Sequence, residues 1–212
     1  MKKIYDITMS VTAETAPFPG DTPFSLEWVW TMEMGGSCNV SRIVMSPHVG
    51  THGDSPYHYG STGGKTEEVP LDVYVGEALV VNVPRESGAL ISREFVEDVM
   101  KKAGDGVTRV LFKTDSYPDH TVFNTDFTAI APEAVLALAD LGVRLIGMDT
   151  PSVDPADSKT LDAHGAFLQR GVYILENLRL HEVPAGRYEL IALPMKIEGS
   201  CAAPVRAILR SL

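Results

Sequence analysis

The chain has 212 residues, a formal net charge of −10 and an apolar fraction of 44%. This composition is typical of folded proteins, so it excludes disorder over most of the length and predicts a single domain over residues 1–212. The acidic balance argues against a nucleic-acid partner, which needs clustered lysines and arginines, and no apolar run approaches the roughly 20 residues that would predict a membrane partner.

Apolar runs and alternating patterns predict the elements in chain order. The first half of the chain contains strands over residues 4–10, 24–33, 40–46 and 76–83. A rigid loop with three prolines and a glycine at 17–23 separates the first two strands. The second half contains helices over 92–103 and 132–141, and strands over 109–114, 144–148, 172–176, 189–193 and 204–209. Strands outnumber helices and alternate with them in the middle, which favours an α/β fold with a mixed β-sheet and flanking helices.

A cluster of polar side chains follows the third predicted strand. His48, His52, Asp54 and His58 fall within eleven residues and all occupy even positions. In an extended chain alternate side chains share a face, so this spacing would align all four. A helix would also bring His48 and His52 together, but the prolines and glycines between them disfavour one. We therefore expect a strand end that leads into a turn.

Two imidazoles and a carboxylate form a ligand set that suits zinc, manganese or iron. Structural zinc sites are usually closed by thiolates, and no cysteine pair lies near this cluster. Three protein ligands with an open position are typical of catalytic zinc, and an aspartate is able to bridge two ions. The cluster therefore indicates a catalytic metal site with one or two metals.

Two cysteines, Cys38 and Cys201, are too few for a disulfide framework, although one disulfide stays open from the sequence. We interpret both as small buried hydrophobic residues in a reducing compartment. The N-terminus has two lysines but no apolar run after them, which argues against a signal peptide. These observations predict a cytoplasmic protein.

The segment from His48 to His58 resembles the H-x-G-T-H-x-D-x-P-x-H signature of the cyclase family of metal-dependent hydrolases. Segments 17–23, 146–154, 158–164 and 188–194 are similar to those of one branch of that family, the bacterial kynurenine formamidases. The resemblance extends over essentially the whole chain. It implies a swivelling β/β/α-like fold built from a mixed sheet and flanking helices.

The resemblance also implies two divalent metal ions per subunit, with Zn²⁺ as the first expectation and Mn²⁺ as the second. The implied roles are metal ligands at His48, His52, Asp54, His164 and Glu176, with Asp54 and Glu176 bridging, and a proton donor and acceptor at His58. From the residues alone, His164 reads as a polar loop residue. Glu176 ends an apolar run, where an unpaired buried carboxylate would be costly, and either a metal or simple exposure at the strand end would remove that cost. Asp149 and Asp154 lie in a turn, where turn formation and the orientation of a ligand are both sufficient explanations.

The implied reaction is hydrolysis of N-formyl-L-kynurenine to L-kynurenine and formate in tryptophan degradation. Related formamidases commonly have Trp at the position of Phe18, where it helps to bind the substrate; Phe keeps the aromatic face but loses the indole N–H. Family members are typically homodimers, and the loop around Phe18 is a candidate for a position near the interface.

Three other functions remain open at this point. A related metal hydrolase would act on a cyclic amide such as isatin, or on another aryl amide. A non-catalytic protein would use the same scaffold to bind a metal or a small ligand. His58 argues against this function, because a histidine that binds no metal in the implied scheme has no purpose in a protein that only binds. A purely structural domain is disfavoured by the histidine cluster.

Overall fold

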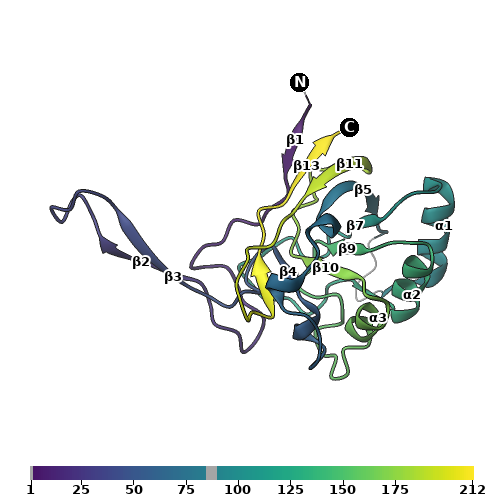
Figure 1. The fold of residues 1–212 in the computed structure, drawn as a ribbon, viewed down its shortest axis with the longest axis horizontal. Helices are drawn as coiled ribbons and strands as arrows, with labels where there is room; N and C mark the ends of the chain where they lie inside the picture. Colours follow the sequence, from purple (N-terminus) through teal and green to yellow (C-terminus); the bar gives the residue numbers. More distant parts are fainter. Residues whose placement is uncertain (1, 85–89) are drawn as a thin grey trace.

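The computed structural model describes residues 2–84 and 90–212, and its framework is one mixed sheet (Figure 1). In spatial order the sheet contains β1 (Ile4–Asp6), β13 (Ile208–Ser211), β11 (Gly186–Ile191), β5 (Val75–Asn82), β7 (Arg109–Lys113), β9 (Leu145–Met148), β10 (Tyr173–Glu176), β4 (His52–Asp54) and β12 (Ala202–Pro204). Two-stranded sheets pair β2 (Ser25–Trp30) with β3 (Val40–Val44), and β6 (Leu90–Ile91) with β8 (Ala129–Ile130).

In the part of the chain that the structure describes, three α-helices flank this sheet on one side (Figure 1): α1 (Arg93–Ala103), α2 (Pro132–Asp140) and α3 (Asp162–Arg170). Short 3₁₀ turns form η1 (Pro56–His58), η2 (Thr66–Glu68) and η3 (Leu71–Val73). The predicted mixed sheet with flanking helices is therefore confirmed. The prediction of α1 is also correct in its cap, because the Ser92 hydroxyl accepts a hydrogen bond from the Phe95 amide.

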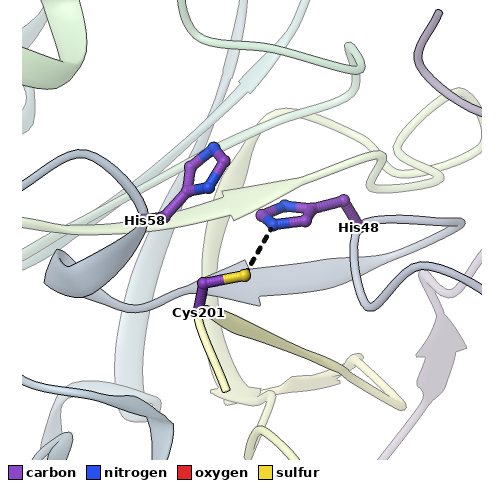
Figure 2. A group of neighbouring side chains, drawn as sticks. All are labelled: His48, His58 and Cys201. Atoms are coloured by element: carbon purple, nitrogen blue, oxygen red, sulfur yellow. Dashed lines mark hydrogen bonds between the residues drawn. The ribbon is translucent and has the colours of Figure 1, made fainter. Parts of the chain in front are cut away.

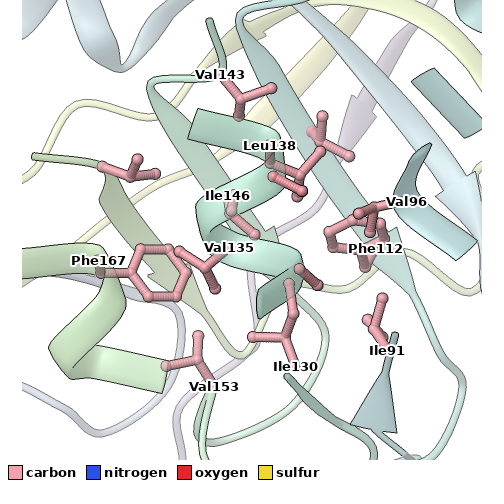
Figure 3. Packing of buried hydrophobic residues seen from close by; sticks show 14 of the residues in the cluster. Ile91, Val96, Phe112, Ile130, Val135, Leu138, Val143, Ile146, Val153 and Phe167 are labelled. Carbon is pink, nitrogen blue, oxygen red and sulfur yellow. The ribbon is translucent and has the colours of Figure 1, made fainter. Parts of the chain in front are cut away.

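The central strands β5, β7, β9 and β10 run parallel, and alternate side chains enter two cores. Phe112 and Ile146 point toward the helices and pack with Val135 and Leu138 of α2 (Figure 3). Leu111, between these positions in the alternation, packs into the core on the opposite face of the sheet. Because both faces of these strands are buried, their positions in the sheet are fixed. The end of β10, which carries a site residue, is fixed with them.

The predicted strand over 204–209 is wrong. Pro204 ends β12 at one edge of the sheet, where it pairs with His52, and β13 begins at Ile208 near the other edge, where it pairs with Ile191. Four residue steps span at most about 14 Å, so both ends of the nine-strand row must lie close together. The sheet is therefore strongly curled.

Helix α3 is absent from the sequence prediction, which placed only a motif there. Its N-cap position, Leu161, has a left-handed backbone conformation and provides no side-chain cap. The cap comes instead from Asp154, whose carboxylate oxygens accept hydrogen bonds from the amides of Ala163 (2.9 Å) and His164 (3.0 Å). Because the capping side chain belongs to the preceding loop, the residues at the start of α3 show no capping pattern in the sequence.

The β2–β3 hairpin projects away from the rest of the molecule (Figure 1). We call residues 25–44 the arm. Every residue of its two strands is exposed, and its large apolar side chains have no cover. The exposed ones are Leu26, Trp28, Val29, Trp30, Met32, Met34, Val40, Ile43 and Val44. Within the described residues, no helix is both long and apolar enough to cross a membrane.

Candidate metal centre

Strand β4 and the turn before it carry the first part of the site. His52 and Asp54 lie on the same face of β4 and are almost completely buried. The turn brings His48 over them through Gly50, whose φ of +76° is costly for any residue with a Cβ. The Gly50 carbonyl accepts a hydrogen bond from His52 Nδ1 at 2.9 Å, which turns Nε2 toward Asp54.

The antiparallel neighbour of β4 supplies Glu176. It is the last residue of β10 and pairs directly with His52, so the two side chains lie on one face. Glu176 Oε2 lies 3.2 Å from His52 Nε2, while Oε1 accepts a hydrogen bond from the Val153 amide at 2.9 Å. Glu176 is 4% exposed, so simple exposure at a strand end does not explain it.

Helix α3 brings in His164 from the second half of the chain. Its Nδ1 lies 2.6 Å from Asp154 Oδ2, and its Nε2 lies 3.6 Å from Asp54 Oδ2. Asp154 therefore orients this ring as well as capping the helix. Asp149 does not contribute, because its carboxylate accepts hydrogen bonds from Thr114 and the Asp115 amide.

His58 lies on η1 at the edge of this group. Its ring centroid is 4.2 Å from that of His48 and 5.8 Å from that of His164. The even spacing predicted one shared face for four residues, but only His52 and Asp54 belong to a strand. A turn places His48 and a 3₁₀ turn places His58, so the expected strand end and turn are correct while the continuous extended face is wrong.

The donor atoms converge on the two oxygens of Asp54. His48 Nδ1 lies 3.1 Å and His52 Nε2 lies 3.3 Å from Oδ1, while His164 approaches Oδ2. His52 Nε2 and both Asp54 oxygens are buried without a hydrogen-bond partner. Buried polar atoms are rarely left unpaired, and a pair of imidazoles with carboxylates is a good ligand set for divalent cations. We call His48, His52, Asp54, His164 and Glu176 the cage; its donors fit such ions.

The close approach of imidazoles and carboxylates also shifts the pKa values of the cage residues. Burial opposes charge on His52, but Asp54 and Glu176 more than offset it and raise its pKa to about 10. Burial likewise opposes charge on His164, whose pKa is raised to about 10 by Asp154 and Asp54. The three surrounding imidazoles hold the pKa of Asp54 well below its ordinary value despite its burial. Burial lowers the pKa of His58, which favours its neutral form.

A cavity of about 430 Å³ opens over the cage, a size that suits a small molecule. Its walls include Phe18, His58, Leu161 and Cys201. The Phe18 ring packs edge-on against Phe123 with centroids 4.9 Å apart, so an aromatic face is held at the opening. Five of the seven site residues predicted from the sequence line this cavity: Phe18, His48, His58, His164 and Glu176. The other two, His52 and Asp54, are buried against the cage residues that line it.

The interpretation of both cysteines as buried is wrong. Cys38 is an exposed free thiol on the arm, and Cys201 is a partly exposed free thiol in the cavity wall. Cys201 Sγ lies 3.4 Å from His48 Nε2. Sequence reasoning missed this contact because 153 positions separate the two residues and no motif joins them.

Comparisons with known proteins agree with this geometry. Residues 5–155 match the Cyclase family, described as putative cyclase. The chain is 43% identical over 212 residues to a kynurenine formamidase of Bordetella avium, covering 100% of each chain. A potential metal-dependent hydrolase with cyclase activity is 30% identical, with a TM-score of 0.84 and coverage of 100% of this chain and 99% of that one.

Isatin hydrolase A from Labrenzia aggregata shares the fold at 24% identity, with a TM-score of 0.87 over 99% of this chain and 94% of that chain. The expected fold is therefore confirmed. The family match spans more than half of the residues, and the formamidase match spans all of them. This chain belongs to the cyclase family.

Proposed function

We propose that this protein is a metal-dependent formamidase that hydrolyses N-formyl-L-kynurenine to L-kynurenine and formate in tryptophan degradation, with residues 1–212 acting as one catalytic unit. The observation that carries the proposal is the buried cage beneath an aromatic-walled cavity. Full-length similarity to a kynurenine formamidase supports the choice of substrate.

The cage would hold two divalent cations. Imidazole and carboxylate donors suit both Zn²⁺ and Mn²⁺, and Zn²⁺ is the first expectation. The residues that would hold the ions are His48 and His52, which lie closest to Asp54 Oδ1, and His164, which lies closest to Asp54 Oδ2. Glu176, whose Oε2 lies 3.2 Å from His52 Nε2, would help to hold the ions. When bound, such ions activate water and stabilise the charge that develops on a carbonyl oxygen.

His58 would move the proton in this reaction. Water adds to the formyl carbon, the bond from that carbon to the aryl nitrogen breaks, and the nitrogen needs a proton to leave as a neutral amine. His58 lines the cavity beside the cage and is not one of the proposed metal ligands. It would take a proton from the attacking water and deliver it to the nitrogen.

Phe18 would bind the aromatic ring of the substrate. It is 38% exposed, lines the cavity and is steadied by Phe123. An exposed aromatic face held in place offers stacking without the cost of ordering a flexible side chain.

A homodimer belongs to the same proposal, and the arm supports it. Soluble monomers rarely expose a contiguous apolar surface as large as that of Trp28, Trp30 and their neighbours. Both faces of the hairpin are exposed, so a second copy would enclose the arm rather than cover one side of it. We also assign the protein to the cytoplasm, since Cys38 and Cys201 are both free thiols.

The decisive test is turnover by the purified protein after metal analysis. We expect about two divalent ions per chain and hydrolysis of N-formyl-L-kynurenine that greatly exceeds hydrolysis of isatin or of simple anilides. Preferential opening of isatin would move the protein to the cyclic-amide activity. A protein that binds metal but turns over no amide would support the non-catalytic alternative, and an active metal-free protein would overturn the mechanism.

A further inference from the structure

Each imidazole of the cage uses one ring nitrogen to face Asp54 and places the other against a partner. His52 turns Nε2 to Asp54 while Nδ1 contacts the Gly50 carbonyl at 2.9 Å. His164 repeats the arrangement, with Nδ1 2.6 Å from Asp154. Such partners fix the tautomer of a ligating histidine, because the nitrogen that faces a metal must present its lone pair and the other nitrogen then carries the hydrogen.

His48 is mounted the other way round. Its Nδ1 lies 3.1 Å from Asp54 Oδ1, and its Nε2 points away from the cage to Cys201 Sγ at 3.4 Å. Figure 2 shows this contact as the dashed line, with His58 beside the pair. Among the described residues, Sγ is the hydrogen-bond partner recorded for this nitrogen.

We propose that Cys201 is a positioning residue for the metal centre: its sulfur accepts the Nε2 hydrogen of His48 and so keeps the Nδ1 lone pair directed into the cage. The inference rests on the proposed metal centre. It gives the third imidazole the kind of partner that the Gly50 carbonyl and Asp154 give the other two.

The backbone holds Cys201 in place independently of its thiol. The Cys201 carbonyl accepts hydrogen bonds from the amide and the hydroxyl of Ser55, each at 2.9 Å. Ser55 follows Asp54 directly in the chain, so these bonds tie the cysteine to the strand that carries the cage. A change of the thiol alone therefore removes the contact with His48 and leaves the local backbone anchored.

A direct ligand role for the thiol makes different predictions. Donor atoms of His48, His58 and Cys201 lie within 4.8 Å of one another, close enough to share an ion at the mouth of the cavity. In that arrangement sulfur would bind the metal itself. In ours, sulfur lies behind the imidazole and never contacts the ion.

The test measures Zn²⁺ affinity of the full chain by chelator competition for the wild type and for Cys201→Ala, Cys201→Ser and Cys201→Asp. We expect Cys201→Ala to weaken binding of one ion about 10- to 100-fold, the usual effect of losing such a partner. Cys201→Asp should restore the affinity because a carboxylate is a stronger acceptor, and Cys201→Ser should be intermediate. Cys38→Ser, which removes the exposed thiol on the arm, is the matched control and should bind like the wild type.

Cobalt substitution separates positioning from ligation. We expect the Co²⁺-loaded wild type to lack a near-ultraviolet sulfur-to-cobalt charge-transfer band; such a band would overturn the proposal in favour of a thiolate ligand. Unchanged affinity in the folded Cys201→Ala and Cys201→Ser chains would also overturn it. If neither Zn²⁺ nor Co²⁺ binds to the wild type, the proposed metal centre itself is wrong. That result differs from failure of the positioning role, because the wild type and every variant would then show the same absence of binding.

Discussion

The cage and the arm are incomplete in opposite ways. In the cage, His52 Nε2 and both carboxylate oxygens of Asp54 are buried without a hydrogen-bond partner among the described residues. On the arm, apolar side chains such as Trp28 and Trp30 are exposed without cover, at 57% and 55% of their surface. Burying an unpaired polar group and exposing a large apolar one both cost free energy. Each region therefore shows what would complete it, a cation for the cage and a protein surface for the arm.

The largest effect should follow from Asp54→Asn, which breaks the cage at its centre. The amide keeps the shape but loses the charge and one acceptor oxygen that the two groups of imidazoles share. We expect metal content to fall below one ion per chain and hydrolysis to fall to background, as measured by elemental analysis and turnover. Asp157→Asn, on an exposed loop residue, is the matched control. A fully loaded Asp54→Asn protein would contradict our account of the cage.

His58→Ala should separate chemistry from metal binding. The proposed ligand set is intact in this variant, so metal content should equal that of the wild type. The rate constant kcat should fall about 100- to 10,000-fold, the usual contribution of general acid–base catalysis. Loss of metal together with activity would instead place His58 among the ligands.

The arm is tested by Trp28→Ser and Trp30→Ser, which remove its largest apolar side chains. If these residues are buried against a second copy, each change should weaken the dimer about 30-fold, as expected for a loss of about 2 kcal/mol. Sedimentation velocity over a range of concentrations measures the shift. Asp105→Asn, an exposed residue outside the arm, should leave the assembly intact. A wild-type monomer would remove the dimer and leave the arm for another partner.

The pH dependence of stability should distinguish an empty cage from a loaded one. Without metal, the pKa values of His52 and His164 are raised from 6.5 to about 10 in the folded chain. Their protons therefore stabilise the metal-free fold fully below about pH 6.5, and this contribution is lost as the pH rises through about 10.

Urea unfolding in chelator should thus show stability declining over that range. The metal-loaded chain, whose imidazoles carry no such protons, should decline less. His181→Asn, which changes an exposed histidine, should leave both curves unchanged. Equal slopes with and without metal would contradict the assignment of those protons to the cage.

The smallest effect is expected for Phe18→Trp at the cavity wall. The substitution keeps the aromatic face and adds an N–H donor, so we expect KM for N-formyl-L-kynurenine to change only a few-fold and kcat to stay the same. Phe18→Ala removes the face and should raise KM more. Identical kinetics for all three would remove Phe18 from substrate binding.

The part of the site that the sequence predicts is the part held by local spacing. His48, His52, Asp54 and His58 lie within eleven residues, and the pattern indicates a metal cluster before any fold is known. His164 was linked to them only by family resemblance, because α3 lacks a local cap and its partner residues come from other loops.

The remaining differences have the same origin in tertiary structure. The strand predicted over 204–209 is divided between two edges of a curled sheet, and an apolar pattern does not reveal which edge a residue joins. The contact of Cys201 with His48 likewise depends on the pairing of β12 with β4. The elements of the central sheet, by contrast, were predicted correctly because burial on both faces gives them continuous apolar runs.

Asp154 has a consequence that reaches beyond the geometry of one ring. The Asp154 carboxylate caps α3 and also holds the His164 imidazole. Formation of the first helical turn and correct orientation of the His164 ring are therefore coupled. Opening of that turn would release the imidazole, and an ion bound to His164 would in return hold the turn closed. The amide hydrogens of Ala163 and His164 are thus a built-in reporter of metal occupancy, whose exchange with solvent should slow when the cage is filled.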